Sequence, residues 1–419
     1  MDSGWILDPL SRLDSMAAIF AVTGRTVLIC TTDHSPFIFM YQPVLQTLRS
    51  GLEGLGAKVH ILFGHRNVWP KSSRLVGGDL LVWVGIPGRD FGLVKWAKLR
   101  GRGVRSAWYN SEPMLDDRIL VPKCRRSYTN AFASVDEIWD YSLFNLHTCA
   151  AAAENISRVL NRSLVLRYVP PGALNLNLSS AETPPPDGRA VFLGLIPANV
   201  SGGRHWQVGF LRRGECFAEL ERKVGHSHLY HTAAVWSTEA LRRLLTQHST
   251  FLNIHKWCGT PQHVDSPAEA LRFAPLLSVG AVVLSEHVYP PDEEQYQGLV
   301  RFVNWEGFAP ALRRIQGVAT EASDPRSLQA PPKPVSGIAE GEAARHARSV
   351  EFQRRFAPVA LLRAAGIHSS SPPAGTAIEE QRMIEEQGIR NRRTGVWLMQ
   401  PHATSGSSRR LSARRPCWL

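Results

Sequence analysis

Long apolar runs are absent from this 419-residue sequence. A membrane-spanning helix needs about 18 uninterrupted apolar residues, and the best candidate, 16–30, is interrupted by Gly24 and Arg25. The start of the chain contains Asp2, Asp8 and Asp14 but only one basic residue, Arg12, which is not typical of a secretory signal. We therefore expect a cytoplasmic protein with no transmembrane segment.

Paired cysteine motifs are also absent. The six cysteines are scattered and none is in a Cys-x-x-Cys pair, so the sequence indicates neither a zinc site nor a dense disulfide scaffold. We expect reduced thiols. Asn155, Asn161, Asn177 and Asn199 each begin an Asn-x-Ser/Thr triplet, and without a signal sequence chance explains them better than glycosylation.

Several well-known catalytic and phosphate-binding motifs are missing. The sequence has no Gly-x-Gly-x-x-Gly after a strand, no Walker loop, no His-Glu-x-x-His and no Gly-x-Ser-x-Gly, which disfavours a Rossmann oxidoreductase, a P-loop enzyme, a zinc protease and an α/β-hydrolase. Gly51-x-x-Gly54-x-Gly56 is interpreted as a turn at a helix end.

The positive charge is concentrated near the end of the sequence. Residues 331–419 contain 14 Lys and Arg against 7 Asp and Glu, so they hold +7 of the total +12. Pro, Ser, Ala, Arg and Glu dominate from about 320 onward, and only 350–365 has an apolar helical stripe. This composition predicts a basic, mostly disordered tail over 320–419 with one or two helices, able to make a weak contact with polyanions.

The rest of the chain alternates buried strands with helical stretches. Strands are expected at 25–30, 57–63, 79–84, 104–109 and 137–141, and again at 190–194, 251–255, 281–285 and 299–304. Helix-length connections between strands indicate parallel pairing. The predicted fold class is therefore α/β, with two Rossmann-like domains at 20–170 and 189–318 and a Pro-rich connection between them.

Polar side chains end two strands of the second domain. Asn253 and His255 end the first of these strands, Ser285 and Glu286 end the second, and a helix with Glu269 and Arg272 lies between them. Ligands of open parallel sheets bind at the carboxyl ends of strands, so these side chains form a candidate ligand site. Two simpler interpretations stay open: Glu269 and Arg272 as an ordinary i,i+3 surface pair, and His255 as a buried core histidine.

The segment FLNIHKWCGTPQHVDSPAEALRFAPLLSVGAVVLSE resembles the donor-binding core of bacterial-type GT-B glycosyltransferases. WYNSE at 108–112 and DEIWDYS at 136–142 are similar to two further elements of that family. The resemblance implies two domains facing across a cleft, transfer of a sugar from a nucleotide-diphosphate sugar to an unidentified acceptor, and neither a metal nor a cofactor. The acceptor could be a glycan, a lipid or a protein.

The resemblance also assigns roles to residues. It implies a nucleotide-sugar donor bound by Asn253, His255, Glu269, Arg272, Ser285 and Glu286, with Arg272 on the pyrophosphate and Glu286 on the ribose. The acceptor would enter over the N-terminal domain. Its catalytic base would be His34, Asp33 or Glu112, although His34 as a plain loop residue stays open.

One departure from the family pattern leaves a second function open. Many retaining GT-B enzymes have two glutamates eight residues apart before the Gly-led strand, and Pro267 and Pro275 occupy those positions here. The alternative function is a non-catalytic GT-B-like binding module that uses its basic tail for an acidic partner.

Overall fold

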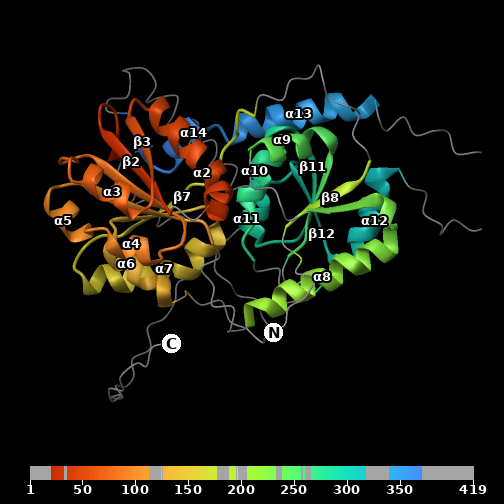
Figure 1. Ribbon diagram of the computed structural model, residues 1–419, viewed down its shortest axis with the longest axis horizontal. Coiled ribbons are helices and arrows are strands. Elements are labelled where there is room, and N and C mark those ends of the chain that lie inside the picture. The colour runs from red at the N-terminus through yellow and green to blue at the C-terminus, as the bar shows by residue number, and fades with distance from the viewer. Residues whose placement is uncertain are drawn as a thin grey trace, which may run out of the picture. The chain divides into compact units, whose positions relative to one another are not determined.

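The computed structural model describes residues 20–32, 35–112, 124, 126–176, 188–194, 196, 205–232, 238–255, 258–259, 266–317 and 339–369 (Figure 1). These residues form two parallel α/β sheets, which confirms the predicted fold class. No helix within them is long and apolar enough to cross a membrane.

The first sheet has six parallel strands in the order β3-β2-β4-β5-β6-β7. They are β2 (Thr26–Thr31), β3 (Lys58–Phe63), β4 (Leu80–Val84), β5 (Arg105–Asn110), β6 (Glu137–Asp140) and β7 (Val165–Tyr168). Every residue of β4, Leu-Leu-Val-Trp-Val, is buried because helices cover both faces of the sheet. Such uninterrupted apolar runs explain why most of these strands could be found from sequence.

Helices line the two faces of the first sheet. They are α2 (Ser35–Gly54), α3 (His65–Ser72), α4 (Arg89–Leu93), α5 (Trp96–Gly101), α6 (Arg126–Ser134) and α7 (Leu143–Val159). Val27 and Ile29 of β2 pack in one core with α2, whereas Leu28 and Cys30 pack in a second core with α3 to α7. This alternation follows from the two-residue period of a strand.

The second sheet has five parallel strands in the order β12-β11-β10-β8-β9. They are β8 (Ala190–Leu193), β9 (Leu229–Thr232), β10 (Thr250–Asn253), β11 (Val282–Glu286) and β12 (Val300–Val303). Their helices are α8 (His205–Val224), the 3-10 turn η2 (His226–His228), α9 (Thr238–Gln247), α10 (Ala270–Ser278), α11 (Pro290–Gln295) and α12 (Trp305–Gln316). The strand order reverses between β8 and β10, and such a reversal is where doubly wound sheets bind ligands.

A segment assigned to the tail is folded. Residues 339–368 form α13 (Ala339–Arg355), α14 (Pro358–Ala364) and β13 (Ile367–His368), and β13 pairs with β1 (Phe20–Ala21). Phe352 and Leu362 are completely buried. The sequence predicted one or two helices within this mostly disordered region, and α13 and α14 are two such helices, whose sparse apolar side chains are enough to bury against the body. Residues 320–338 and 370–419 lie outside the described residues.

The C-terminal helices contact both sheets' helical layers. In Figure 1, α13 lies along α10 and α14 lies against α2. Gly51 and Gly54 of α2 allow the second contact, since a Cβ atom would lie 2.6 Å from Leu362 Cδ1 and 2.5 Å from Val359 Cγ2, respectively. The motif does lie at a helix end, because α2 ends at Gly54 and a turn with Gly56 at φ 84° follows. The sequence did not predict that the missing side chains of Gly51 and Gly54 let a second helix approach closely.

A buried ion pair ties the first sheet together. Arg167 Nε of β7 lies 2.6 Å from Glu137 Oε2 of β6, and both side chains are almost fully buried. Arg105 Nε reaches the other oxygen at 2.5 Å. Arg167 also donates to the carbonyl of Ala365, just after α14. The C-terminal segment therefore completes the hydrogen bonding of a charge inside the first sheet.

Four cysteines are paired rather than reduced. Cys124 is bonded to Cys149 and Cys216 to Cys258, so the expectation of free thiols is wrong for them. The partners lie 25 and 42 residues apart in sequence, and only the packing of α8 and of the helices on the first sheet brings them together. Cys30 is a buried free thiol, and Cys417 lies outside the described residues.

Candidate functional site

The carboxyl ends of β10 and β11 hold a connected set of polar side chains. Asn253 and Ser285 are register partners on the two strands, and Asn253 Nδ2 donates to Ser285 Oγ at 2.9 Å. Arg272 Nη1 of α10 donates to Asn253 Oδ1 at 2.5 Å. The amide of Asn253 therefore fixes the guanidinium over the strand ends, beside the reversal of strand order.

A second arginine lies in the same place. Arg213 Nη2 of α8 is 3.6 Å from Glu269 Oε1, and Arg272 Nη2 is 3.4 Å from Glu269 Oε2. The Arg213 side chain is 4% exposed, that of Arg272 17% and that of Glu269 33%. Burial lowers the pKa of Arg213 to about 10, so it stays charged at neutral pH. Two cations thus share one carboxylate, and this donor set suits an anion with several oxygens.

Glu286 has a structural task in this arrangement. Its Oε2 accepts the backbone N–H of His255 at 2.8 Å, and its Oε1 accepts that of Gly259 at 3.1 Å. Burial raises the pKa of this carboxyl group, and the two backbone donors oppose that rise. These contacts fix the backbone at His255 and Gly259, in the segment that follows β10. Glu286 therefore positions this segment, which forms the wall of the candidate site.

His255 lies in that wall. The residue is 6% exposed, and its Nδ1 is 3.5 Å from Ser266 Oγ, which precedes α10. The imidazole therefore links the segment after β10 to the segment that leads into the helix with Arg272. This placement agrees with a donor-site residue and equally with the buried core histidine that the sequence left open.

Polar groups also gather at the carboxyl ends of β5 and β6. Asn110 Nδ2 donates to Asp140 Oδ2 at 2.7 Å and to the backbone oxygen of Glu112 at 2.6 Å. Asn145 Nδ2 donates to Asp140 Oδ1 at 3.0 Å. Burial raises the pKa of Asp140 well above its usual range. The network fixes Glu112, whereas the other two expected catalytic residues, Asp33 and His34, lie outside the described residues.

Tyr141 connects the two groups electrostatically. Its hydroxyl is buried, which raises its pKa well above the usual value, and the carboxylates of Asp140, Glu112, Glu269 and Asp292 raise it further. Glu112 comes from the first sheet and Glu269 from the second. The structure therefore brings the expected acceptor-side carboxylate and the donor-side carboxylate into the surroundings of one phenol.

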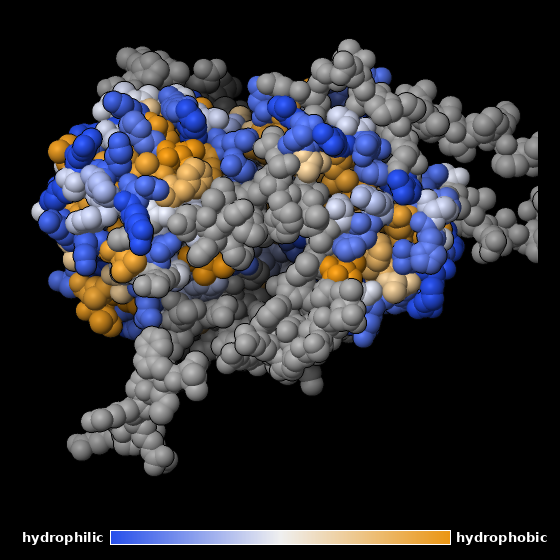
Figure 2. Space-filling model, in the orientation of Figure 1, coloured by the Kyte–Doolittle hydropathy of each residue, from blue (hydrophilic) through white to orange (hydrophobic). Residues whose placement is uncertain are grey.

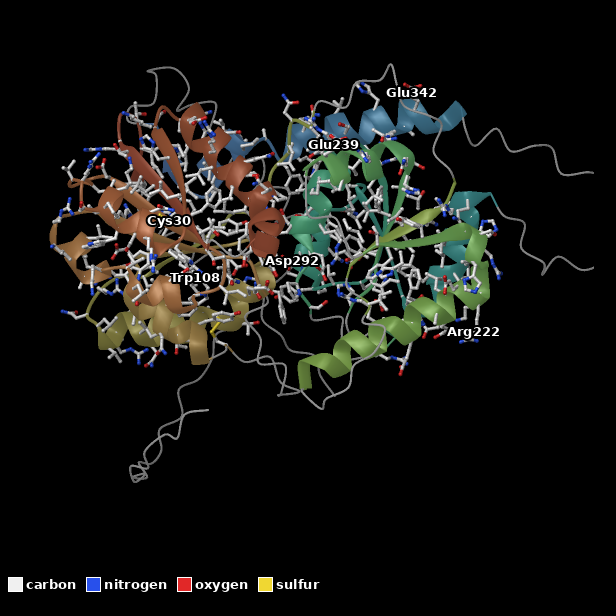
Figure 3. All side chains as sticks on the ribbon, in the orientation of Figure 1. Cys30, Trp108, Arg222, Glu239, Asp292 and Glu342 are labelled. Atoms are coloured by element: carbon white, nitrogen blue, oxygen red, sulfur yellow. A yellow bond between two sulfur atoms is a disulfide. The ribbon has the colours of Figure 1, made fainter. Side chains whose placement is uncertain are left out.

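Asp292, labelled in Figure 3, is a buried carboxylate that joins α11 to the start of α7. Its Oδ2 accepts from Ser142 Oγ at 2.5 Å, and its Oδ1 accepts from Leu143 N at 2.7 Å. Ala268 N lies 3.4 Å from Oδ2. Burial raises the pKa of Asp292 to about 6 despite these donors, so its charge is costly in the folded protein.

Sequence reasoning missed Arg213 and Asp292. Arg213 belongs to α8, the helix that follows β8, and β8 lies beside the reversal of strand order. If the strand order had been known from the sequence, Arg213 would have been a candidate site residue. Asp292 follows Pro290 and Pro291 in the first turn of α11, where a carboxylate usually caps its own helix. No local signal shows that it caps α7 instead.

No group of three or more His, Cys, Asp and Glu side chains in the described ranges could hold a metal ion. The polar groups that are present are arginines, carboxylates, amides and hydroxyls. They suit recognition of an anionic, hydroxyl-rich molecule through charge and hydrogen bonds.

No family model matches the chain, and no curated sequence does. Among solved structures, an alpha-glucosyltransferase in complex with UDP is similar, with a TM-score of 0.45, 11% identity and coverage of 79% of this chain and 96% of that chain. HepE from Anabaena in complex with UDP and glucose has a TM-score of 0.43, 10% identity and coverage of 81% and 97%. The N-terminal domain of Candida albicans trehalose-6-phosphate phosphatase has a TM-score of 0.42, 9% identity and coverage of 83% and 99%.

Proposed function

We propose that the protein is a GT-B-type glycosyltransferase that moves a sugar from a nucleotide-diphosphate sugar to a hydroxyl-bearing acceptor. The observation that supports this most is the convergence of Arg213 and Arg272 at the carboxyl ends of β10 and β11. A pyrophosphate has several charged oxygens, and two guanidinium groups at a sheet's reversal point match that charge and geometry.

The donor residues divide into contacts and supports. Arg213 and Arg272 bind the pyrophosphate, and Asn253 with Ser285 holds Arg272 in place. Glu269 is the most exposed of the charged groups here, so it is assigned to a ribose hydroxyl. Glu286 and His255 shape the pocket wall rather than contact the ribose, because both Glu286 oxygens hold backbone N–H groups.

The reaction needs an acceptor hydroxyl, a base and a stabilised leaving group. The oxygen of the acceptor forms a bond to the anomeric carbon, the bond between that carbon and the phosphate oxygen breaks, and the hydroxyl proton goes to the base. Glu112, Asp33 and His34 are the candidates for the base. The nucleoside diphosphate leaves with its added charge on the two arginines, without a resident metal or cofactor.

The domain roles and the acceptor class are further parts of the proposal. Residues 20–170 form the acceptor domain and 189–318 the donor domain, and the acceptor is a glycan, a lipid or a protein. The second candidate function is a GT-B-like binding module without catalysis, whose basic C-terminal region contacts an acidic partner. Pro267 and Pro275, in place of the glutamate pair, favour this alternative.

Calorimetric titration with UDP, GDP, ADP and CMP sugars tests the donor site. Arg213→Ala and Arg272→Ala should each weaken nucleotide binding by roughly ten- to a hundredfold, because a charge-assisted hydrogen bond contributes about 1.5–3 kcal/mol. Arg272→Lys should recover part of the loss, since it restores charge but not paired donors. Arg243→Ala is the matched control, because Arg243 is exposed on α9 and its ion pair within the described part of the chain is with Glu239.

Three results would separate the candidates. Binding that depends on both arginines, together with release of nucleoside diphosphate on incubation, supports the transferase. Equal binding by wild type and both alanine variants, or no binding by a folded wild type, removes the donor site. Arginine-dependent binding without any donor hydrolysis or transfer favours the binding module.

The compartment is a separate part of the proposal. The sequence favoured the cytoplasm, but the Cys124–Cys149 and Cys216–Cys258 disulfides are typical of oxidising compartments. We therefore place the working protein in an oxidising compartment. Mass spectrometry of protein that is unfolded and alkylated before reduction should find these four cysteines unmodified. Alkylation of all four under these conditions would contradict this placement and favour the cytoplasm.

A further inference from the structure

A groove with a volume of about 880 Å³ runs along β3, the edge strand of the first sheet. Residues of β3 line it between α2 on one face of the sheet and α3 on the other. In Figure 2, hydrophobic surface at the position of β3 and α2 is bordered by hydrophilic residues. The groove uses none of the residues assigned to the donor or acceptor sites.

The outer backbone of β3 is open for hydrogen bonding. Lys58 N donates to the carbonyl of Arg25, just before β2, and Gly64 N to the carbonyl of Thr31, at the end of β2, so residues with even numbers face the neighbouring strand. By alternation, the N–H and C=O groups of Val59 and Ile61 point into the groove. No described strand pairs with β3 on that side. An extended chain placed there would find an unpaired edge.

The charge of the groove has one sign. Its lining includes Arg49, Lys58, Lys71 and Arg74 but no aspartate or glutamate. Arg49 is paired with Glu53, whereas Lys58, Lys71 and Arg74 are exposed and have no ion pair with a carboxylate of the described residues. Like charges would oppose pairing of β3 with β3 of a second copy. A segment rich in carboxylates meets no such opposition.

We propose that the groove binds an acidic peptide that adds to β3 as an extra strand. Backbone hydrogen bonds to Val59 and Ile61 would supply the peptide-specific part of the affinity, and the basic side chains would select the sequence. Lys71 and Arg74 lie on the α3 side, whereas Gln42, Leu45, Gln46 and the Glu53-paired Arg49 line the α2 side. Side chains of an added strand alternate between these sides, so the preferred ligand has an acidic residue at every second position.

Fluorescence anisotropy with the full-length protein and a labelled decapeptide of alternating Glu and Val tests the proposal. Saturable binding is expected. The same peptide with every backbone nitrogen methylated has the same charge but no N–H donors, and it should not bind. Equal binding of the methylated peptide would show attraction by charge alone and would overturn the proposal, as would the absence of saturable binding by either peptide.

Protein variants locate the binding site. Lys71→Glu combined with Arg74→Glu should weaken binding of the unmethylated peptide by at least about tenfold. Lys95→Glu is the matched control, because Lys95 is exposed on the same lobe but outside the groove, and it should have little effect. If both charge-reversal proteins, each folded by circular dichroism, bind like wild type, the groove is not the site.

Discussion

Replacing Asp292 with asparagine should remove the contribution of this residue to the pH dependence of stability between about pH 4 and pH 6. Burial raises the pKa of Asp292 from 3.8 to about 6, so the folded state holds this proton more tightly than the unfolded state does. The stability that the protonated form contributes is fully present below the unfolded pKa and is lost as the pH rises through about 6.

The shift sets the expected magnitude. It amounts to about two pKa units, each worth about 1.4 kcal/mol, so wild type should lose roughly 3 kcal/mol of unfolding free energy across this range relative to the variant. Asparagine keeps the geometry, because its oxygen can accept from Leu143 N and its amide can donate to Ser142 Oγ. It lacks the titration and also the long 3.4 Å contact with Ala268 N, because an amide nitrogen cannot accept that hydrogen bond.

Urea unfolding followed by tryptophan fluorescence at pH 4, 5, 6 and 7 measures the effect. The stability of Asp292→Asn relative to wild type should rise with pH. Glu294→Gln removes an exposed carboxylate from the same helix and should not reproduce that rise. A difference between Asp292→Asn and wild type that is the same at pH 4 and pH 7, or that shrinks with pH, would refute the reasoning.

Three further predictions concern stability and are checked by denaturant unfolding. Deleting the chain from 339 onward should unfold or severely destabilise the body, because each buried apolar side chain of α13 and α14 contributes about 1.5–3 kcal/mol; a stable truncated body would contradict this. Gly51→Ala should lower the free energy of unfolding by about 1–3 kcal/mol through overpacking. Gly92→Ala is the control: its added Cβ meets nothing within 4 Å, and it should raise the free energy of unfolding by up to about 1 kcal/mol. Arg167→Ala should lower the free energy of unfolding by about 3–5 kcal/mol, because the buried Glu137 carboxylate loses one of its two cationic partners. A loss below about 1 kcal/mol would contradict this and would show that Arg105 alone neutralises Glu137.

Apolar runs are the clearest strand signals in the sequence, although Arg105–Asn110 and Glu137–Asp140 were predicted without a continuous one. Leu80–Val84 and Val282–Glu286 are buried between helical layers, and their β-branched and aromatic residues mark them without ambiguity. Val165–Tyr168 was missed because it is an edge strand with Arg167 in the middle. The short β9 was also missed because it is an edge strand with little apolar sequence: only one residue of Leu-Tyr-His-Thr is buried. Edge strands need less apolar sequence, so their local signal is weak.

The candidate site was predictable only where its residues end strands. Asn253 and Ser285 follow apolar runs, so their proximity could be inferred from parallel pairing alone. Arg213 lies within a helix that contains several other charged residues, and nothing local distinguishes a buried arginine from a solvated one. The disulfide between Cys216 and Cys258 could not be predicted from local sequence either, because 42 residues separate the two cysteines. These contacts depend on strand order, which the sequence pattern does not specify.

The contact between Arg167 and Ala365 has a consequence for how the chain is made. A ribosome that has finished β7 has released every strand of the first sheet, but the acceptor for Arg167 lies 198 residues further along. At about 5–20 residues per second, that carbonyl arrives roughly 10–40 seconds later. During this interval the glycine face of α2 is uncovered and a buried cation lacks one acceptor. Until Ala365 has been made, the nascent first domain therefore exposes apolar surface that the finished protein buries.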